Sequence, residues 1–272
     1  MTLRENGAVK YLTFESLDAL PCARNYFTTR LGGVSSGVHA SMNLAFTNGD
    51  DPACVYANFD VITKVIGVSP DHVVRTMQTH TTNVMKVTED HVYDDGVLHE
   101  QEWTDVDGLM TDVSGIALAT FYADCVPLYF VDPVRHVIAL SHSGWRGTAA
   151  DMAGVTVRRM NEEYGCDPKD LHAAIGPSIC RDHYEVSEVV AHAFMRAFPD
   201  DHELILTDGR EPGKYQLDLR EANRLCMLKA GIPEANVEVA DECTYSNQEL
   251  FFSHRASDGK RGNMAAFLIL NQ

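Results

Sequence analysis

Three short segments of the chain combine side chains that can bind a metal ion or act as nucleophile and base. They read M-Q-T-H, Y-A-D-C and S-H-S-G-W-R-G, and they contain His80, Cys125 and His142, respectively. Each segment lies at the end of a run of apolar residues that is typical of a buried strand. Side chains at strand ends in α/β sheets are held by a rigid frame and still reach solvent, so they often line clefts. These three residues are therefore the main candidates for a functional site.

One cysteine and two histidines are a suitable set of zinc ligands, because imidazole nitrogen and thiolate sulfur match this borderline-soft ion. Three protein ligands leave a fourth position for water or substrate, as in catalytic zinc sites, where the pKa of bound water falls to about 7. Without a metal, Cys125 and His142 form a thiolate–imidazole pair, with Asp124 or a backbone carbonyl orienting the histidine. An isolated cysteine is also often a small buried apolar residue, so the residue types leave a purely structural role open.

A second candidate is an anion-binding loop near the N-terminus. Residues 28–35 read T-T-R-L-G-G-V-S, which places Arg30 beside a flexible Gly-Gly turn. Guanidinium donors and exposed backbone N–H groups both favour phosphate, although the stretch is also compatible with an ordinary turn. Near the C-terminus, F-F-S-H-R places two aromatic rings beside His254 and Arg255. Such rings can stack on a base, but two phenylalanines are more often core residues.

Helices and strands in an irregular order must position these residues. Helices are expected at 52–66, 148–164, 187–198 and 218–230, from their apolar faces and from Pro, Asp and Gly at their ends. Strands are expected at 72–78, 83–87, 115–121, 126–131, 136–140, 171–176, 236–240 and 264–270. Near-continuous apolar strands covered by amphipathic helices are typical of α/β layers. The chain has no G-x-G-x-x-G or Walker loop, which argues against a dinucleotide-binding or P-loop fold.

The bulk composition narrows the class of partner. With 39 acidic and 22 basic residues, the formal charge of −17 disfavours nonspecific binding to nucleic acid or to anionic membranes. No apolar run approaches the roughly 20 residues that a membrane-spanning helix needs, and the start has no signal-peptide pattern. The seven cysteines form no C-x-x-C pair, which favours free thiols in a reduced, cytoplasmic protein. Most of the cysteines other than Cys125 are expected to be small core residues. We expect a single domain over residues 1–272, as a monomer or small homo-oligomer.

Read together, the motifs resemble one family. F-T-T-R-L-G-G-V-S, S-M-N-L, Q-T-H, D-G-L-M-T, A-D-C-V-P-L, H-S-G-W-R-G, I-G-P-S-I-C with Y-E-V, and C-T-Y-S-N with F-F-S-H-R occur in the order expected of the YfiH/LACC1 family. Its members were once called multicopper polyphenol oxidases or laccases and are now described as purine nucleoside phosphorylases. The matches run from about residue 26 to the C-terminus. The resemblance implies an α/β fold, a four-layer α/β/β/α sandwich of the CNF1/YfiH-like type.

The resemblance also implies the chemistry of the site. His80, Cys125 and His142 match the family's zinc ligands and are the expected catalytic residues. Family members phosphorolyse adenosine, inosine, guanosine and methylthioadenosine to a base and a sugar 1-phosphate, and they deaminate adenosine. The substrate and phosphate contacts that we expect are Arg30, Asn43, Gln78, Asp124 and Arg146. Arg30 and Arg146 are the phosphate candidates because a planar guanidinium suits bidentate contact to phosphate oxygens, and Asp124 is the candidate proton shuttle.

The sequence departs from the family pattern in a few places. Thr81 and Thr82 follow His80 where a glycine is common, and H-R-A-S-D-G-K-R-G-N replaces a more arginine-rich stretch. The alternative function is a metal-free cysteine hydrolase or amidase, with Cys125 as nucleophile and His142 as base. It accords with the family's link to the editing of peptidoglycan precursors. Copper is a less suitable metal than zinc and a laccase is disfavoured, because multicopper sites use H-x-H pairs and this chain has none.

Overall fold

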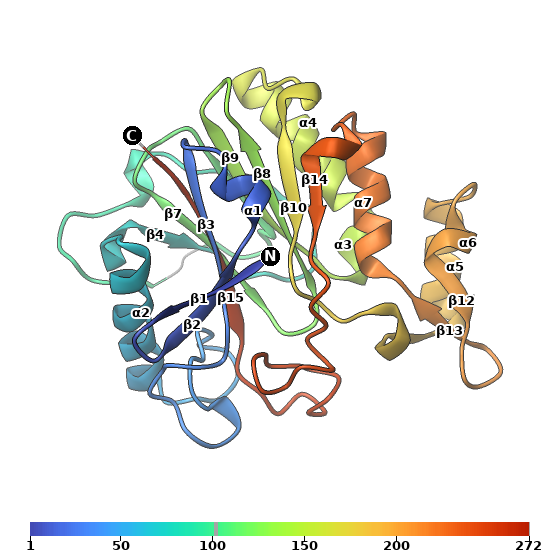
Figure 1. The fold of residues 1–272 in the computed structure, drawn as a ribbon, viewed down its shortest axis with the longest axis horizontal. Helices are drawn as coiled ribbons and strands as arrows, with labels where there is room; N and C mark the ends of the chain where they lie inside the picture. Colours follow the sequence, from blue (N-terminus) through green and yellow to red (C-terminus); the bar gives the residue numbers. More distant parts are fainter. Residues whose placement is uncertain (101–102, 272) are drawn as a thin grey trace.

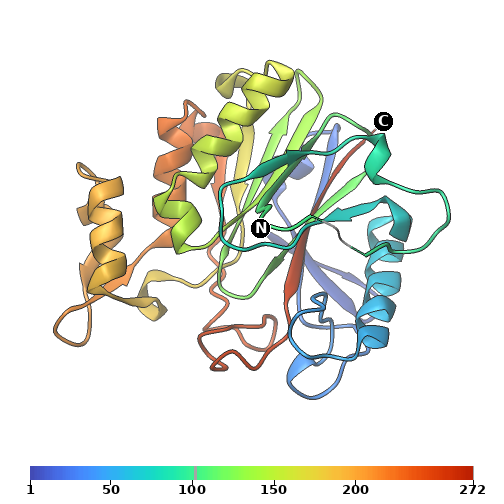
Figure 2. The same ribbon diagram turned by 180° about the vertical axis from the view of Figure 1, so that it is seen from behind.

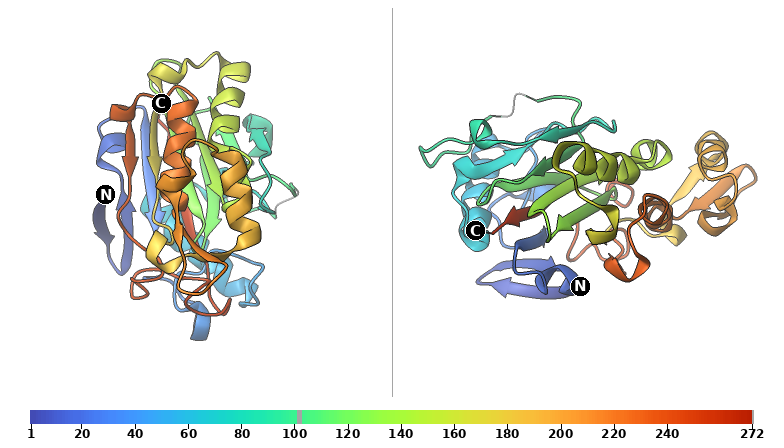
Figure 3. Two further views of the ribbon diagram at one scale, coloured as in Figure 1. Left: turned by 90° about the vertical axis from the view of Figure 1, so that its right-hand side faces the viewer. Right: turned by 90° about the horizontal axis from the view of Figure 1, so that it is seen from above.

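The computed structural model describes residues 1–100 and 103–271. Within these residues, two six-stranded sheets pack face to face and a three-stranded sheet lies to one side (Figures 1 and 3). The first sheet contains, in spatial order, β1 (Thr2–Asn6), β2 (Val9–Thr13), β3 (Ala23–Thr28), β15 (Met264–Leu270), β7 (Ala117–Tyr122) and β4 (Val73–Arg75). The second contains β14 (Val237–Val239), β10 (His172–Ile175), β8 (Val126–Asp132), β9 (Val137–Ser143), β6 (Gly108–Thr111) and β5 (Val84–Lys86). The third contains β11 (Glu185–Ser187), β13 (Lys214–Leu217) and β12 (Leu206–Asp208).

Helices cover the outer faces of both large sheets. The helices are α1 (Glu15–Asp18), α2 (Pro52–Ile66), α3 (Trp145–Ala149), α4 (Met152–Tyr164), α5 (Glu188–Ala197), α6 (His202–Ile205) and α7 (Leu219–Lys229). Helix α2 covers the first sheet, and α4 and α7 cover the second, so the order of layers is α/β/β/α (Figure 1). Helices α5 and α6 accompany the three-stranded sheet at the far side of α7 (Figure 1). The expected four-layer sandwich is confirmed.

The alternation of side chains along the strands creates the layers. On β15, Phe267 and Ile269 pack with α2, while Ala266 and Leu268 pack between the sheets. Successive residues of a strand point to opposite faces, so a strand that is apolar throughout is buried on both faces. All seven residues of β15 are buried, as this arrangement requires.

The same alternation holds in the second sheet. On β8, Leu128 and Phe130 belong to the core beneath the helices, and Tyr129 and Val131 to the core between the sheets. The segment that follows β5 passes beside α2 (Figure 2), and its Leu98 joins the core cluster on that face. The near-continuous apolar runs of the sequence thus mark strands of central layers.

Three expected helices occur where the sequence placed them. Helix α2 begins with Pro52 after Asp51, whose side chain accepts from Ala53 N–H, and it ends at Gly67 with φ of 68°. Helix α7 begins after Asp218, whose carboxylate accepts from Glu221 N–H at 3.0 Å. Helix α5 occupies the expected 187–198 region with a slightly shorter span. These ends confirm the capping signals in the sequence.

The expected continuous helix over 148–164 is wrong. The chain forms α3 from Trp145, leaves the helix at Ala150, and restarts as α4 after Asp151. Asp151 has a positive φ of 63°, and its side chain caps Gly154 N–H. The break arises because Asp151 adopts the left-handed conformation and acts as an N-cap within a stretch that is otherwise helical.

Other elements differ from the expectation or were not anticipated. The strand expected over 72–78 is short, because pairing ends at Arg75 and Met77 makes an isolated bridge with Thr104. Strands β1, β2 and β3 and the three-stranded sheet were not anticipated, because their polar faces break up the apolar pattern. Among the described residues, no helix has the length and apolarity needed to cross a membrane.

Candidate metal centre and pocket

His80, Cys125 and His142 lie together where the two large sheets meet. Cys125 Sγ is 3.8 Å from His80 Nε2. One ligand atom from each of the three residues lies within 4.8 Å of the others. The rings of the two histidines meet edge to face, with 5.0 Å between their centroids. The structure therefore brings together the three residues that the sequence singled out.

The three side chains come from separate parts of the fold, two from connections between the large sheets and one from a strand. Cys125 occupies the tight turn between β7 of the first sheet and β8 of the second. His142 lies near the end of β9, and its side chain is buried. His80 follows β4, with a positive φ of 67°. Cys125 and His142 lie at strand ends, whereas His80 lies in the loop between β4 and β5, where Asp107 holds its backbone N–H.

Asp107 orders two of the three residues, and sequence reasoning assigned it no role. Its Oδ1 accepts from His142 Nδ1 at 2.8 Å and from His80 N–H at 3.0 Å. Its Oδ2 accepts from the N–H groups of Thr79 and Thr81, at 3.1 and 2.8 Å. Because Asp107 engages Nδ1 of His142, Nε2 is the nitrogen left for the cluster. The available signal was an acidic residue at the start of the apolar D-G-L-M-T strand, fully buried in the structure.

The charges of Cys125, His142 and Asp107 stabilise one another. Burial alone raises the pKa of Cys125, but the imidazoles of His142 and His80 outweigh it and lower the pKa to about 6. Burial alone lowers the pKa of His142, but Cys125 and Asp107 raise it to about 9. Burial opposes ionisation of Asp107, and the hydrogen bonds from His142, Thr81 and Thr79 keep its pKa below the ordinary value. Without a metal, the cluster is a thiolate–imidazolium pair held by a carboxylate.

Gly144 allows the close approach of these side chains. A Cβ at this position would lie 2.6 Å from His80 Cδ2 and 3.2 Å from Cys125 Sγ. The backbone itself needs no glycine, since Gly144 has φ of −79°. At Gly147 the nearest atom to an added Cβ would be 3.6 Å away, an ordinary contact. In S-H-S-G-W-R-G, the first glycine therefore makes room for the cluster.

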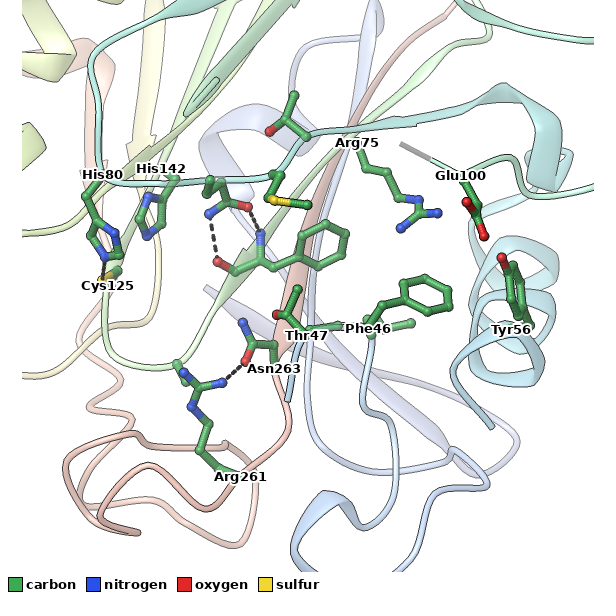
Figure 4. Close-up of a pocket in the computed structure, with 17 residues that line it drawn as sticks. Phe46, Thr47, Tyr56, Arg75, His80, Glu100, Cys125, His142, Arg261 and Asn263 are labelled. Carbon is green, nitrogen blue, oxygen red and sulfur yellow. Dashed lines mark hydrogen bonds between the residues drawn. The ribbon is translucent and has the colours of Figure 1, made fainter. Parts of the chain in front are cut away.

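The cluster forms one end of a pocket of about 420 Å³ (Figure 4). In this view His80, Cys125 and His142 lie on one side, and Arg75, Glu100 and Tyr56 lie on the other. Aromatic rings of Phe46, Tyr56 and Phe121 also line it. The volume and the mixture of aromatic and charged groups fit a small-molecule site.

Two arginines, Arg75 and Arg261, line this pocket. Arg75 is buried, its Nη2 donates to His99 O at 2.8 Å, and its Cζ lies 4.7 Å from the centroid of Phe46. Arg261 bonds to Asn263, and burial lowers its pKa, an effect that the nearby charges of Asp124 and Cys125 partly oppose. Within the described part of the chain, the buried Nε atoms of both arginines have no hydrogen-bond partner. Two guanidinium groups that line one pocket favour an anionic ligand.

Of the expected substrate contacts, Gln78 lines this pocket, but its amide is occupied. Its Nε2 donates to Phe121 O at 2.9 Å and its Oε1 accepts from Phe121 N–H at 2.7 Å (Figure 4). Asn43 is buried outside the pocket lining, where it bonds to Asp50 and to the backbone of Asn263. Both side chains tie segments of the fold together around the pocket.

The remaining three expected contacts do not line the pocket. Arg30 donates to the carbonyls of Ala40 and Gln248 and lies over Phe252, because its loop folds back on the chain. Arg146 lies over the ring of Trp145, 4.4 Å from its centroid, on the surface beside α5.

Asp124 is buried with a positive φ of 86°. Its carboxylate accepts from the hydroxyl of Thr244 and from Arg255 N–H, both at 2.7 Å. The sequence could not show that these contacts occupy it, because the partners lie more than a hundred residues away.

Comparisons of the sequence and of the fold with known proteins identify a family. The sequence model described as multi-copper polyphenol oxidoreductase laccase matches residues 24–271. A Geobacillus stearothermophilus protein named purine nucleoside phosphorylase YlmD is 37% identical over 241 residues, 89% of this chain and 88% of that protein. A protein from an unknown prokaryotic organism, named adenosine deaminase RL5, is 34% identical over 84% of this chain and 87% of its own length. The crystal structure of Bacillus licheniformis hypothetical protein YfiH superposes with a TM-score of 0.91, at 32% identity and 99% coverage of both chains. The chain therefore belongs to the YfiH family, whose sequence model carries the multi-copper laccase description.

Proposed function

We propose that this protein is a zinc-dependent purine nucleoside phosphorylase that also deaminates adenosine. The proposal rests on one observation, a His-Cys-His cluster at the end of a pocket that also holds aromatic rings and two arginines. The names of the relatives accord with it. The substrates would be adenosine, inosine, guanosine and methylthioadenosine, with phosphate.

The donor set supports zinc at the cluster. His80, Cys125 and His142 would hold the ion, since two imidazole nitrogens and one thiolate match its preference. In a tetrahedral site, bond lengths of about 2.3 Å to sulfur and 2.0 Å to nitrogen put sulfur and nitrogen about 3.5 Å apart. The 3.8 Å between Cys125 Sγ and His80 Nε2 is close to that separation. When bound, zinc supplies an electrophilic centre and an acidified water.

The chain's own groups would orient both substrates. The rings of Phe46, Tyr56 and Phe121 offer faces on which a purine can stack. Arg261 lies near Cys125 and is the guanidinium best placed to hold phosphate at the cluster end. Holding the anion and the nucleoside in one partly closed pocket lowers the entropic cost of bringing phosphate to C1′. Arg75 remains charged at neutral pH, since burial lowers its pKa only to about 10.

The test is an incubation of purified protein with adenosine or inosine, with and without phosphate, followed by chromatography. Phosphate-dependent release of free base and ribose 1-phosphate supports phosphorolysis, and inosine from adenosine supports deamination. Unchanged nucleosides under both conditions refute the proposal. The His80→Ala variant is expected to lose bound zinc and both activities together.

A specific contact pattern favours a cysteine amidase as the second candidate. Cys125, His142 and Asp107 form a nucleophile, base and orienting carboxylate, with His142 Nδ1 on Asp107 at 2.8 Å. In that case amide cleavage survives removal of metal by a chelator and stops when Cys125 is alkylated. Loss of activity on chelation, with recovery on adding zinc, excludes this alternative.

A further inference from the structure

A second group of metal-ligating side chains lies outside the pocket. Cys180, His183 and Cys243 offer ligand atoms that all lie within 4.8 Å of one another. Cys180 Sγ is 3.1 Å from His183 Nδ1, and Cys243 Sγ is 3.8 Å from the same nitrogen. We propose that these three residues bind a borderline-soft divalent ion of the zinc class, at a site separate from the His80–Cys125–His142 cluster.

The local fold presents the three ligands to one point. Cys180 precedes a single 3-10 turn (Arg181–His183), and His183 N–H donates to Cys180 O at 3.1 Å, so a C-x-x-H pair faces one side. Cys243 comes from a distant segment that runs alongside, with an isolated parallel bridge between Ser178 and Cys243. Zinc sites often combine a close pair of ligands from one turn with ligands from another segment; with three protein ligands here, the fourth position would be left to water.

The distances suit a metal better than a set of ordinary side-chain contacts. Tetrahedral zinc places two sulfurs, or a sulfur and a nitrogen, about 3.5–3.8 Å apart, given bonds of about 2.3 and 2.0 Å. Both observed separations, 3.1 and 3.8 Å, join a sulfur to His183 Nδ1 and lie on either side of the sulfur–nitrogen value of about 3.5 Å, so the ligands need to move by only small amounts. The N–H of Cys180 donates to Cys243 Sγ at 3.3 Å, so the two segments already hold their sulfur atoms close together.

Access and orientation also fit. The three residues are half-buried, and the exposed Ser246 hydroxyl lies 3.3 Å from His183 Nδ1, so this side is open to solvent. The ring of His183 stacks on Tyr245 with 4.4 Å between centroids, which fixes the plane of the imidazole. By contrast, Cys22, Cys166 and Cys226 are buried.

A metal at this site would stabilise the two segments that pack against the turn carrying Cys125. Asp124 O accepts from Ile179 N–H at 3.1 Å, next to Cys180. Asp124 Oδ1 accepts from the hydroxyl of Thr244 at 2.7 Å, next to Cys243. A metal joining Cys180 to Cys243 therefore crosslinks the two segments that hold Asp124 in place. The role that we infer is structural support of this turn.

Thiol protection in the unaltered protein tests the site directly. Metal-stripped, reduced full-length protein is alkylated with iodoacetamide alone, with Zn²⁺ or with Mg²⁺, and the peptides are quantified by mass spectrometry. We expect Zn²⁺, and not Mg²⁺, to slow alkylation of Cys180 and Cys243. Cys54, a half-buried thiol on α2 outside both clusters, is the internal control and keeps its rate. Unchanged alkylation of Cys180 and Cys243 with Zn²⁺ overturns the proposal, as does a Cys180–Cys243 disulfide that persists in reductant.

Zinc stoichiometry separates this site from the first one. We expect two equivalents per chain in the wild type, one in Cys243→Ser, and two in the matched control Cys54→Ser. The His80→Ala variant is expected to keep protection of Cys180 and Cys243 whether or not the nucleoside activities exist. If Cys243→Ser retains both equivalents, the proposal is wrong. Protection in the wild type settles the question if a variant fails to fold.

Discussion

Asp107→Asn tests whether one carboxylate prepares the His80–Cys125–His142 cluster for metal. The carboxylate accepts five hydrogen bonds from His142, His80, Thr79 and Thr81, the last through both its N–H and its hydroxyl. Asparagine has one acceptor oxygen, so it keeps at most the three bonds on the Thr79 and Thr81 side. Its NH₂ group then faces the His80 N–H and His142 Nδ1.

This rearrangement changes the tautomer of His142. An NH₂ donor at Nδ1 requires an unprotonated Nδ1, which places the proton on Nε2 and removes the lone pair that binds metal. Loss of such a supporting contact typically lowers metal affinity about 10–100-fold, which corresponds to about 1.4–2.7 kcal/mol. Losing a hydrogen bond to a charged group also lowers the free energy of unfolding by about 1.5–3 kcal/mol.

The assay is protection of Cys125 from alkylation as zinc concentration rises, because it reports on this cluster alone. The zinc concentration for half-protection is expected to rise about 10–100-fold in Asp107→Asn. Asp105→Asn is the matched control, since Asp105 is exposed in the same loop and its side chain accepts from the Thr79 hydroxyl at 2.6 Å. An unchanged midpoint in Asp107→Asn, or an equal shift in Asp105→Asn, refutes the reasoning.

Three further predictions follow from other contacts. Gly144→Ala is expected to abolish zinc protection of Cys125, because the added Cβ would lie 2.6 Å from His80 Cδ2, whereas Gly147→Ala, with 3.6 Å of clearance, keeps it. Arg261→Ala is expected to raise the KM for phosphate more than that for inosine, in steady-state assays at varied phosphate; equal effects on both would place the phosphate elsewhere. Hydrogen bonds from Asp95 and Gly96 N–H outweigh the burial of Asp71 and lower its pKa to about 2. Its charge therefore stabilises the fold above pH 4, by about 2 kcal/mol relative to Asp71→Asn, and this difference falls by about half at pH 3. Urea unfolding at pH 6 and pH 3 measures it, and a difference that does not shrink contradicts the assignment.

The sequence predicted the parts of the fold that depend on one local feature, either an unbroken apolar run or a set of residues at the ends of a helix. The strand runs of β8 and β15, and the first four residues of β9, are apolar at nearly every position because both faces are buried. Helix α2 carries a cap, a proline and a terminal glycine. The break at Asp151 escaped prediction because a left-handed aspartate leaves little trace in an otherwise helical pattern.

The candidate site also contains residues that the sequence predicted and residues that it could not place. His80, Cys125 and His142 stand out by residue type at the ends of apolar runs, and their motifs match a family. Arg30 and Arg146 also have a suitable type, but type alone does not tell which way a side chain turns, and both lie against aromatic rings away from the pocket. Long-range contacts decide these cases, so the contribution of Arg261 to the pocket emerges only from the three-dimensional structure.

For the cysteines, sequence spacing failed to reveal a cluster that the structure contains. A scattered set without C-x-x-C spacing favoured small core residues, and this description fits Cys22, Cys166 and Cys226. Cys180 and Cys243 are separated by more than sixty positions, and the parallel bridge between Ser178 and Cys243 brings Cys243 to Cys180 and His183. The C-x-x-H pair was visible in the sequence, but its third ligand was not.

Asp124 connects the two clusters. As a proton shuttle it would need an oxygen free to exchange protons with substrate, yet Thr244 and Arg255 occupy its two oxygens and little of the side chain is exposed. Its backbone carbonyl holds Ile179, beside Cys180, and Thr244 lies beside Cys243, while Cys125 follows Asp124 directly. Asp124 thus links the turn that carries Cys125 to the two segments that carry Cys180 and Cys243. We therefore expect a metal at the second cluster to help hold the Cys125 turn in place through these two contacts.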